Sequence, residues 1–248
     1  MADNDSSAGF VIPTIDIAPF LADPTSTASA AVVEAVREAA MTTGFFSLVG
    51  HGVPTALQQE VLRAARRLFA LPAEEKKRLV PAGGKPLGRG YELIGAQVLQ
   101  AGTLPDLKEV VSASPSEPVG PPDWLTAAPQ GFYIGRHVAA SDERARRHPH
   151  FVGENLFPAG VPAAEMQQPA EAYYDAVLGL AQAVLAVLAR GLPYGDDVFA
   201  DFASRDPLCT LRLLHYPPAS SGDARQLGAG AHTDFGRHPF PPPGSGRR

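Results

Sequence analysis

A histidine and a carboxylate two positions apart, His232 and Asp234, are the residues of this sequence best suited to chemistry. In an extended strand, residues i and i+2 project from the same face, so both side chains can bind one ion. One imidazole and one carboxylate are two of the three ligands in the facial triad that holds non-haem iron(II) and leaves coordination positions open. Because this spacing also arises by chance, it predicts a metal site only together with its surroundings.

Other histidines are weaker candidates for a metal ligand. His238 lies in a proline-rich stretch without a strand pattern, where no partner is expected to orient its ring. His215 and Tyr216 are adjacent and therefore face opposite sides of a strand, and His51 lies in a glycine-rich turn. The basic run 144–150 contains two histidines and could suggest an anion or metal site, but we interpret it as a solvated loop.

The elements that must position these residues begin with two strand-like segments, 12–17 and 45–49, separated by a helix that should stop at Gly44. An amphipathic helix follows after residue 54, and the charged run 74–78 predicts a solvated face with paired charges. A long helix should begin near Pro169 and end before Gly191. Its apolar spacing predicts core positions at Tyr173, Val177, Leu180, Val184, Leu185 and Leu188.

The metal motif follows two further extended segments. Residues 210–216 have the pattern of a strand that ends at two prolines, and residues 227–235 form a glycine-spaced segment that contains both candidate ligands. From 237 to 248 the periodicity is lost and four of twelve residues are proline. We expect this tail to be disordered.

Composition narrows the classes of partner. The 248 residues are 45% apolar and 19% charged, which fits a folded domain, and the net charge of −5 is spread along the chain. We therefore expect neither nucleic acid nor a membrane as a partner. Cys209 is the only cysteine, so no disulfide-linked partner is expected either. The polar, acidic start lacks the pattern of a secretory signal, which predicts a cytoplasmic protein.

Seven motifs occur in an order that resembles the isopenicillin N synthase-like family of iron(II)- and 2-oxoglutarate-dependent dioxygenases. The resemblance covers residues 11–236, and the motifs lie at 12–16, 44–53, 71–76, 90–92, 155–158, 211–218 and 227–236. It implies an α+β fold, in which a region of helices and strands is followed by the beginning of a double-stranded β-helix, or jelly-roll, whose barrel is incomplete. We expect an N-terminal region at 11–125, connecting loops and the main helix at 126–205, the start of the jelly-roll at 206–236 and the tail at 237–248.

The resemblance also implies a reaction and its cofactors. Such enzymes bind iron(II) and 2-oxoglutarate, convert 2-oxoglutarate to succinate, and hydroxylate, desaturate or cyclise an organic small molecule, often with ascorbate as a reductant. His232 and Asp234 match two iron ligands, and Tyr216 matches a tyrosine that contacts 2-oxoglutarate. Leu214 stands where many relatives have an asparagine that helps to hold the cosubstrate. A role in specialised metabolism is expected.

Two parts of the family site have no counterpart in the 248 residues: a distal histidine ligand and an Arg-x-Ser pair that binds the far carboxylate of 2-oxoglutarate. Both belong tens of residues beyond Gly236. The resemblance therefore implies a C-terminally truncated member, with weak or absent binding of iron and 2-oxoglutarate, and it leaves open whether this chain is an active enzyme. The alternatives are a catalytically inactive remnant, an interaction protein, or the product of a frameshift or an unspliced intron.

Overall fold

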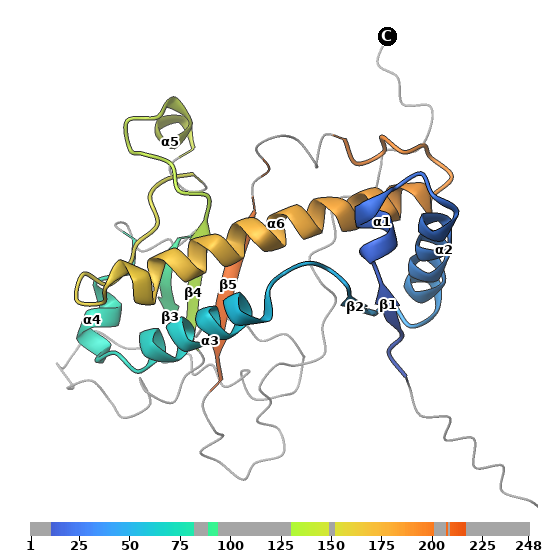
Figure 1. The fold of residues 1–248 in the computed structure, drawn as a ribbon. Coiled ribbons are helices and arrows are strands. Elements are labelled where there is room, and N and C mark those ends of the chain that lie inside the picture. The colour runs from blue at the N-terminus through green and yellow to red at the C-terminus, as the bar shows by residue number, and fades with distance from the viewer. Residues whose placement is uncertain are drawn as a thin grey trace, which may run out of the picture. The chain divides into compact units, whose positions relative to one another are not determined.

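The computed structural model describes residues 11–81, 89–93, 130–148, 152–200, 207 and 209–216. Two compact units divide the chain, Met1–Tyr91 with Phe132–Leu213 and Glu92–Gly131 with Leu214–Arg248. Most described elements belong to the first unit, in which helices and short strands are mixed, as the expected α+β class requires (Figure 1).

The chain begins with a parallel strand pair joined by helices. Strand β1 (Thr14–Asp16) is followed by α1 (Ala18–Ala22), α2 (Thr27–Thr42) and β2 (Ser47–Val49). Because parallel strands need a long crossover, the two helices fill the connection between β1 and β2. Gly44 has a φ of +71° and donates its N–H to the carbonyl of Ala39, 2.9 Å away, which ends α2 where the sequence predicts. The strand register pairs Thr14 with Ser47, Ile15 with Leu48 and Asp16 with Val49.

The charged run after α3 (Thr55–Phe69) is not uniformly solvated. It forms α4 (Ala73–Lys77), on which Lys77 pairs with Glu74 at the surface, 2.7 Å apart. Lys76, by contrast, is only 6% exposed, and its ammonium group donates to the carbonyl of Phe69 at 2.9 Å. Burial lowers the pKa of Lys76. The predicted face of paired charges is therefore wrong at this residue.

The longest helix, α6 (Gln167–Arg190), follows the short 3-10 turn η2 (Ala163–Glu165) and contacts α2 and α3 (Figure 1). Its first turn contains Pro169 and it ends at Gly191, as the sequence predicts. The predicted core face is confirmed in part, because Leu180, Val184 and Leu188 pack against a cluster of buried residues. All six predicted positions are only half-buried, however, and the buried residues of α6 are Pro169, Ala170, Tyr174, Leu178, Val187 and Ala189.

By length and composition α6 could also cross a membrane. The core helix of a globular protein satisfies the same two criteria, and α6 packs against several neighbouring helices. Its hydropathy alone therefore does not indicate a membrane.

Three strands form the second sheet, in the order β3 (Gly90–Leu93), β4 (Gln130–Gly135) and β5 (Thr210–His215). A short helix, α5 (Glu143–Arg147), stands in the basic run for which the sequence predicts a loop. Two clusters of buried residues make the core. One contains Ala64, Leu68, Leu79, Tyr91, Phe132, Ile134, Met166 and Ala170, and the other contains Ile15, Ile17, Phe20, Val32, Val36, Ala39 and Val187.

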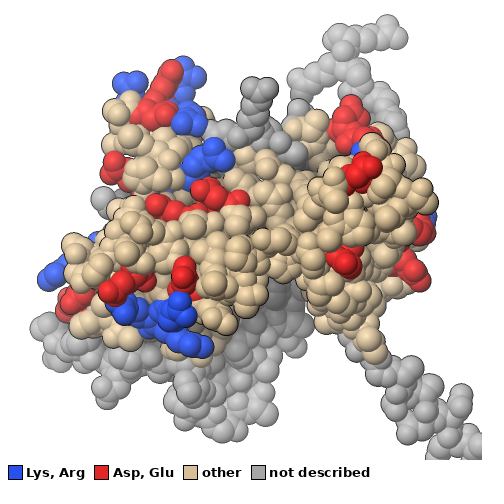
Figure 2. Space-filling view, in the orientation of Figure 1, with Lys and Arg blue, Asp and Glu red and all other residues tan. Residues whose placement is uncertain are grey.

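Acidic and basic side chains are neighbours on the surface that Figure 2 shows. Arg67 pairs with Glu165, and on α5 Arg147 pairs with Glu143. Both are exposed ion pairs of small energetic value, on the order of 0–1 kcal/mol each. They partly neutralise the basic side chains of these two helices.

Candidate functional site

The two predicted iron ligands, His232 and Asp234, lie outside the described residues, as do His238 and the tail 237–248. The projection of both ligands from one strand face therefore stays a prediction. Within the described ranges, no group of three or more histidine, cysteine, aspartate or glutamate side chains is placed to hold a metal ion.

The predicted cosubstrate residue, Tyr216, comes directly after β5 and is 47% exposed. Along β5, exposure alternates as a strand with one packed face requires. Leu211 and Leu213 pack against the first core cluster, while Leu214 is 41% exposed. The segment that the sequence predicts as a strand is thus confirmed as one, with one of its faces on the core.

The other face of β5 presents a cation that the sequence reasoning missed. On the neighbouring strand β4, Phe132 and Ile134 are completely buried in the first core cluster. Tyr133 lies between them and so projects to the opposite side. There the guanidinium carbon of Arg212 lies over the Tyr133 ring, 5.1 Å from its centroid. A cation–π contact of this kind is worth about 0.5–1 kcal/mol at an exposed site.

The carboxamide of Asn155 fixes the end of β4. Its oxygen accepts the backbone N–H of Gly135 at 3.0 Å, and its nitrogen donates to the Gly135 carbonyl at 2.8 Å. The same nitrogen lies 3.3 Å from a carboxylate oxygen of Glu171 on α6. A single side chain therefore satisfies both polar groups of Gly135, as a neighbouring strand would.

Arg89 holds the same region from the other side. Its guanidinium donates to the carbonyl of Arg136 at 2.9 Å and to that of Gly153 at 3.4 Å. Burial lowers the pKa of Arg89. A Cβ atom on Gly135 would overlap this guanidinium, so a larger residue at that position would displace the arginine from its present place. Arg89 precedes the motif at 90–92 and Asn155 opens the motif at 155–158, so both flank segments used for the family resemblance.

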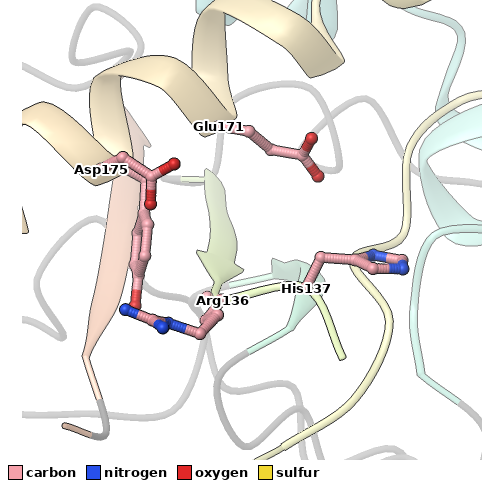
Figure 3. Close-up of a pocket in the computed structure, with 6 residues that line it drawn as sticks. Arg136, His137, Glu171 and Asp175 are labelled. Carbon is pink, nitrogen blue, oxygen red and sulfur yellow. The ribbon is translucent and has the colours of Figure 1, made fainter. Parts of the chain in front are cut away.

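Asn155 and Arg89, which together hold the end of β4, are called the clamp below. A pocket of about 310 Å³ opens beside them and is shown in Figure 3. Glu171 and Asp175 reach it from α6, and Arg136 and His137 from the segment after β4. Its remaining lining residues are Gly135 and Tyr174.

The Tyr174 hydroxyl at this pocket donates to the carbonyl of Cys209, 3.3 Å away. Burial, with a further contribution from Cys209, raises the pKa of Tyr174. Burial also raises the pKa of the Cys209 thiol. Both groups are therefore neutral near pH 7, so Tyr174 offers this pocket a hydrogen-bonding hydroxyl.

The sequence contained a weak signal for this pocket. Glu171, Tyr174 and Asp175 follow each other at i, i+3 and i+4, which places them on one side of a helix. The partners Arg136 and His137 come from a segment more than thirty residues earlier, which no helical pattern can reveal.

A model of one protein family, described as the N-terminal region of non-haem dioxygenases in morphine synthesis, matches residues 12–159. Among curated relatives, the 2-oxoglutarate-dependent dioxygenase citB of Monascus ruber is 42% identical over 236 residues. That match covers 93% of this chain and 64% of citB. The 2-oxoglutarate-Fe(II) type oxidoreductase hxnY of Emericella nidulans is 37% identical over 233 residues, covering 90% of this chain and 58% of hxnY.

A similar fold occurs in the crystal structure of a full-length Neurospora crassa protein in complex with alpha-KG. The TM-score is 0.65 with 24% sequence identity, and the match covers 95% of this chain and 64% of that one. The chain thus spans about three fifths of the length of the proteins it resembles.

Proposed function

The chain belongs to the iron(II)- and 2-oxoglutarate-dependent dioxygenase family, and we propose that the protein oxidises an organic small molecule with oxygen and 2-oxoglutarate. The main support is the family match over residues 12–159, which includes the clamp of Arg89 and Asn155. The proposed outcome is hydroxylation, desaturation or ring closure. Since the curated relatives named above are fungal proteins, we propose a substrate from specialised metabolism. A cytoplasmic location is a separate proposal that comes from the sequence alone.

The donor atoms available after β5 fit iron(II). An imidazole nitrogen from His232 and a carboxylate oxygen from Asp234 are ligand types that this ion accepts in non-haem oxygenases. When bound, iron supplies the activation of oxygen, and the protein fixes its coordination and excludes water. We propose that β5 and the segment 227–236 begin the jelly-roll that holds these two ligands.

Strand β5 would place Tyr216 beside the cosubstrate. Its packed face, through Leu211 and Leu213, attaches the strand to the hydrophobic core and limits its movement. Leu214 has no amide to donate, so we propose that the Tyr216 hydroxyl is the hydrogen-bonding group that β5 offers to 2-oxoglutarate.

Succinate formation tests this function without knowledge of the organic substrate. Purified protein receives iron(II), ascorbate and 2-oxoglutarate, and succinate is compared with that from the His232→Ala, Asp234→Ala double variant. Because the sequence predicts weak or absent binding of iron and 2-oxoglutarate, the criterion is an excess of succinate over the double variant rather than a rate typical of the family. We expect the unaltered protein to form more succinate than the double variant. When cobalt(II) replaces iron(II), we expect the absorption of bound cobalt in the unaltered protein and its loss in the double variant. Equal succinate and equal cobalt spectra in both proteins would contradict the proposed function.

A further inference from the structure

The pocket beside the clamp brings two carboxylates and two basic side chains together. Glu171 and Asp175 lie about one helical turn apart on α6, so both side chains reach the same side of this helix. Figure 3 shows them on the α6 side of the pocket, with Arg136 and His137 on the other side. All the lining residues belong to the first structural unit.

Neither carboxylate forms an ion pair with a basic side chain among the residues that the structure describes. Glu171 instead accepts hydrogen bonds from two neutral amides, those of Asn155 at 3.3 Å and Gln167 at 3.4 Å. These amides hold the carboxylate in place without compensating its charge. Asp175 is exposed and has no hydrogen bond within the same described ranges. Two like charges at i and i+4 destabilise a helix, and a cation that contacts both of them would remove this effect.

A bare metal ion is not the cation that this geometry favours. His137, Glu171 and Asp175 are all possible ligands, but no group of three such side chains in the described parts of the chain is placed to hold one ion. A pocket of about 310 Å³ instead suits a small organic molecule, because cavities that bind such ligands begin at about this volume. An ammonium group on that molecule can donate hydrogen bonds to both carboxylates, since it carries three N–H groups.

Arg136 gives the other side of the pocket the opposite charge. Burial is the main cause of the raised pKa of Tyr174, and the positive charge of Arg136 opposes this effect, as a nearby cation does. The backbone here is held by the clamp, since Arg89 donates to the Arg136 carbonyl at 2.9 Å. A guanidinium binds a carboxylate through two parallel hydrogen bonds. This side therefore suits an anionic group of the same ligand.

We propose that the pocket binds a small zwitterion, with its ammonium group between Glu171 and Asp175 and its carboxylate on Arg136. Its chemical class is that of amino acids whose two charges are separated by a short chain. Opposite charges at the two sides select against a simple amine or a simple acid, because each leaves one side of the pocket without a partner. The site uses neither of the proposed iron ligands and goes beyond the proposed oxygenase function.

Three amino acids of increasing length test the assignment, namely glycine, 4-aminobutyrate and 6-aminohexanoate. Their dissociation constants for the full chain are measured by calorimetry, beside those of butylamine and butyrate, each of which lacks one of the two charges. We expect the best of the three to bind about tenfold more tightly than butylamine or butyrate, because the second charged end adds charge-assisted hydrogen bonds.

Variants that remove one charge separate the two ends of the ligand. In Asp175→Asn and in Glu171→Gln we expect the amino acid and butylamine to bind about three- to tenfold more weakly, with butyrate unchanged. In Arg136→Gln the amino acid should bind no more tightly than butylamine. Because Asp175 is exposed, its replacement does not endanger folding. The matched control is Glu38→Gln, which removes an exposed carboxylate from α2.

The assignment is wrong if none of the three amino acids binds more tightly than butylamine and butyrate, or if either Asp175→Asn or Arg136→Gln leaves the affinity unchanged. Displacement of the amino acid by calcium or by 2-oxoglutarate would also overturn it, since calcium needs only the carboxylates and 2-oxoglutarate has no ammonium group. The binding test is carried out without iron. Its outcome is therefore independent of succinate formation, which tests the proposed function.

Discussion

At the scale of single residues, Asn155 forms the two hydrogen bonds to the Gly135 backbone that a neighbouring strand would otherwise form. Its carboxamide is both the acceptor and the donor for Gly135, at 3.0 and 2.8 Å. Since the site is half-buried, water cannot easily take over both bonds when the amide is removed.

Replacement of Asn155 should therefore destabilise the protein. For Asn155→Ala we expect a loss of about 1–3 kcal/mol in the free energy of unfolding, measured in urea. Asn155→Asp should be unstable at pH 7, because a carboxylate cannot donate to the Gly135 carbonyl and lies near Glu171, and should recover partly at pH 4. Gln168→Ala, an exposed change on α6, is the control. Unaltered stability of Asn155→Asp at pH 7 would contradict the donor role.

Tyr91 should make stability depend on alkaline pH. Burial raises its pKa to about 12 in the folded protein, against an ordinary value of 10.0. Between these values the unfolded chain releases the phenolic proton while the folded chain retains it, so the free energy of unfolding falls as the pH rises. Tyr91→Phe should show a smaller fall between pH 9 and pH 11 in urea titrations. Tyr194→Phe removes an exposed tyrosine and is the comparison, and identical slopes in both variants would contradict the burial effect.

The burial of Lys76 could not be predicted from the sequence around it. The run around it contains lysine, arginine and glutamate, which predicts solvation, and Lys77 with Glu74 behaves accordingly. The long aliphatic stem of lysine also allows burial when a carbonyl is within reach of its ammonium group. That carbonyl belongs to Phe69, and only the packing of α4 against α3 brings it there.

At the scale of elements, helix ends were more predictable than helix faces. Local residues set the ends of α2 and α6, since Gly44 and Gly191 lie where each helix stops. On α6, Leu180, Val184 and Leu188 pack against the second core cluster as predicted, but Tyr174 is buried in place of Tyr173. Alanine, valine and leucine occur all around this helix, so the neighbours that it packs against decide which side is covered.

Two glycines in the turn after β2 differ in the space around them, so one serves as the control for the other. Gly50 and Gly52 both have positive φ, at +65° and +75°. A Cβ atom on Gly50 would overlap the Asp16 carboxylate and lie 2.9 Å from the Ala18 Cβ, whereas on Gly52 it would meet nothing within 4 Å. Gly52→Ala should cost about 1 kcal/mol from the backbone alone. Gly50→Ala should cost about 1–3 kcal/mol more, because of the collision. Equal thermal unfolding of the two variants would contradict this account.

At the scale of the first structural unit, α6 connects the two core clusters. Ala170 belongs to one cluster and Val187 to the other, and the same helix contacts both α3 and α2. If one cluster unfolds, the part of α6 that packs in it loses its contacts, and this disturbs the packing of the same helix in the other cluster.

We therefore expect both clusters to unfold in one transition. Leu68→Ala should lower the free energy of unfolding by about 2–5 kcal/mol, and Val36→Ala by less, because it removes a smaller side chain. Each variant should shift a single calorimetric peak whose van't Hoff and calorimetric enthalpies agree. Two separate peaks, of which each variant moves only one, would show that the clusters unfold independently.

Whether a contact between two residues can be predicted from the sequence depends on how far apart the two residues lie along the chain. The proposed ligands His232 and Asp234 are two residues apart, and ordered motifs surround them, so both could be proposed from the sequence. Arg212 and Tyr133 are separated by 79 residues and meet only because β4 and β5 are neighbours in the sheet. The same holds for the pocket beside Arg136. Contacts of this kind depend on sheet order, which no local pattern contains.

The fit between Arg89 and Gly135 makes substitutions at these two positions interdependent. Because a Cβ atom at position 135 would overlap the guanidinium, a side chain there requires Arg89 to move or to be replaced. If Arg89 moves away, its contact with the Arg136 carbonyl is lost. Among descendants of a common ancestor, arginine at the first position should therefore occur with glycine at the second, and the two sites should vary as a pair.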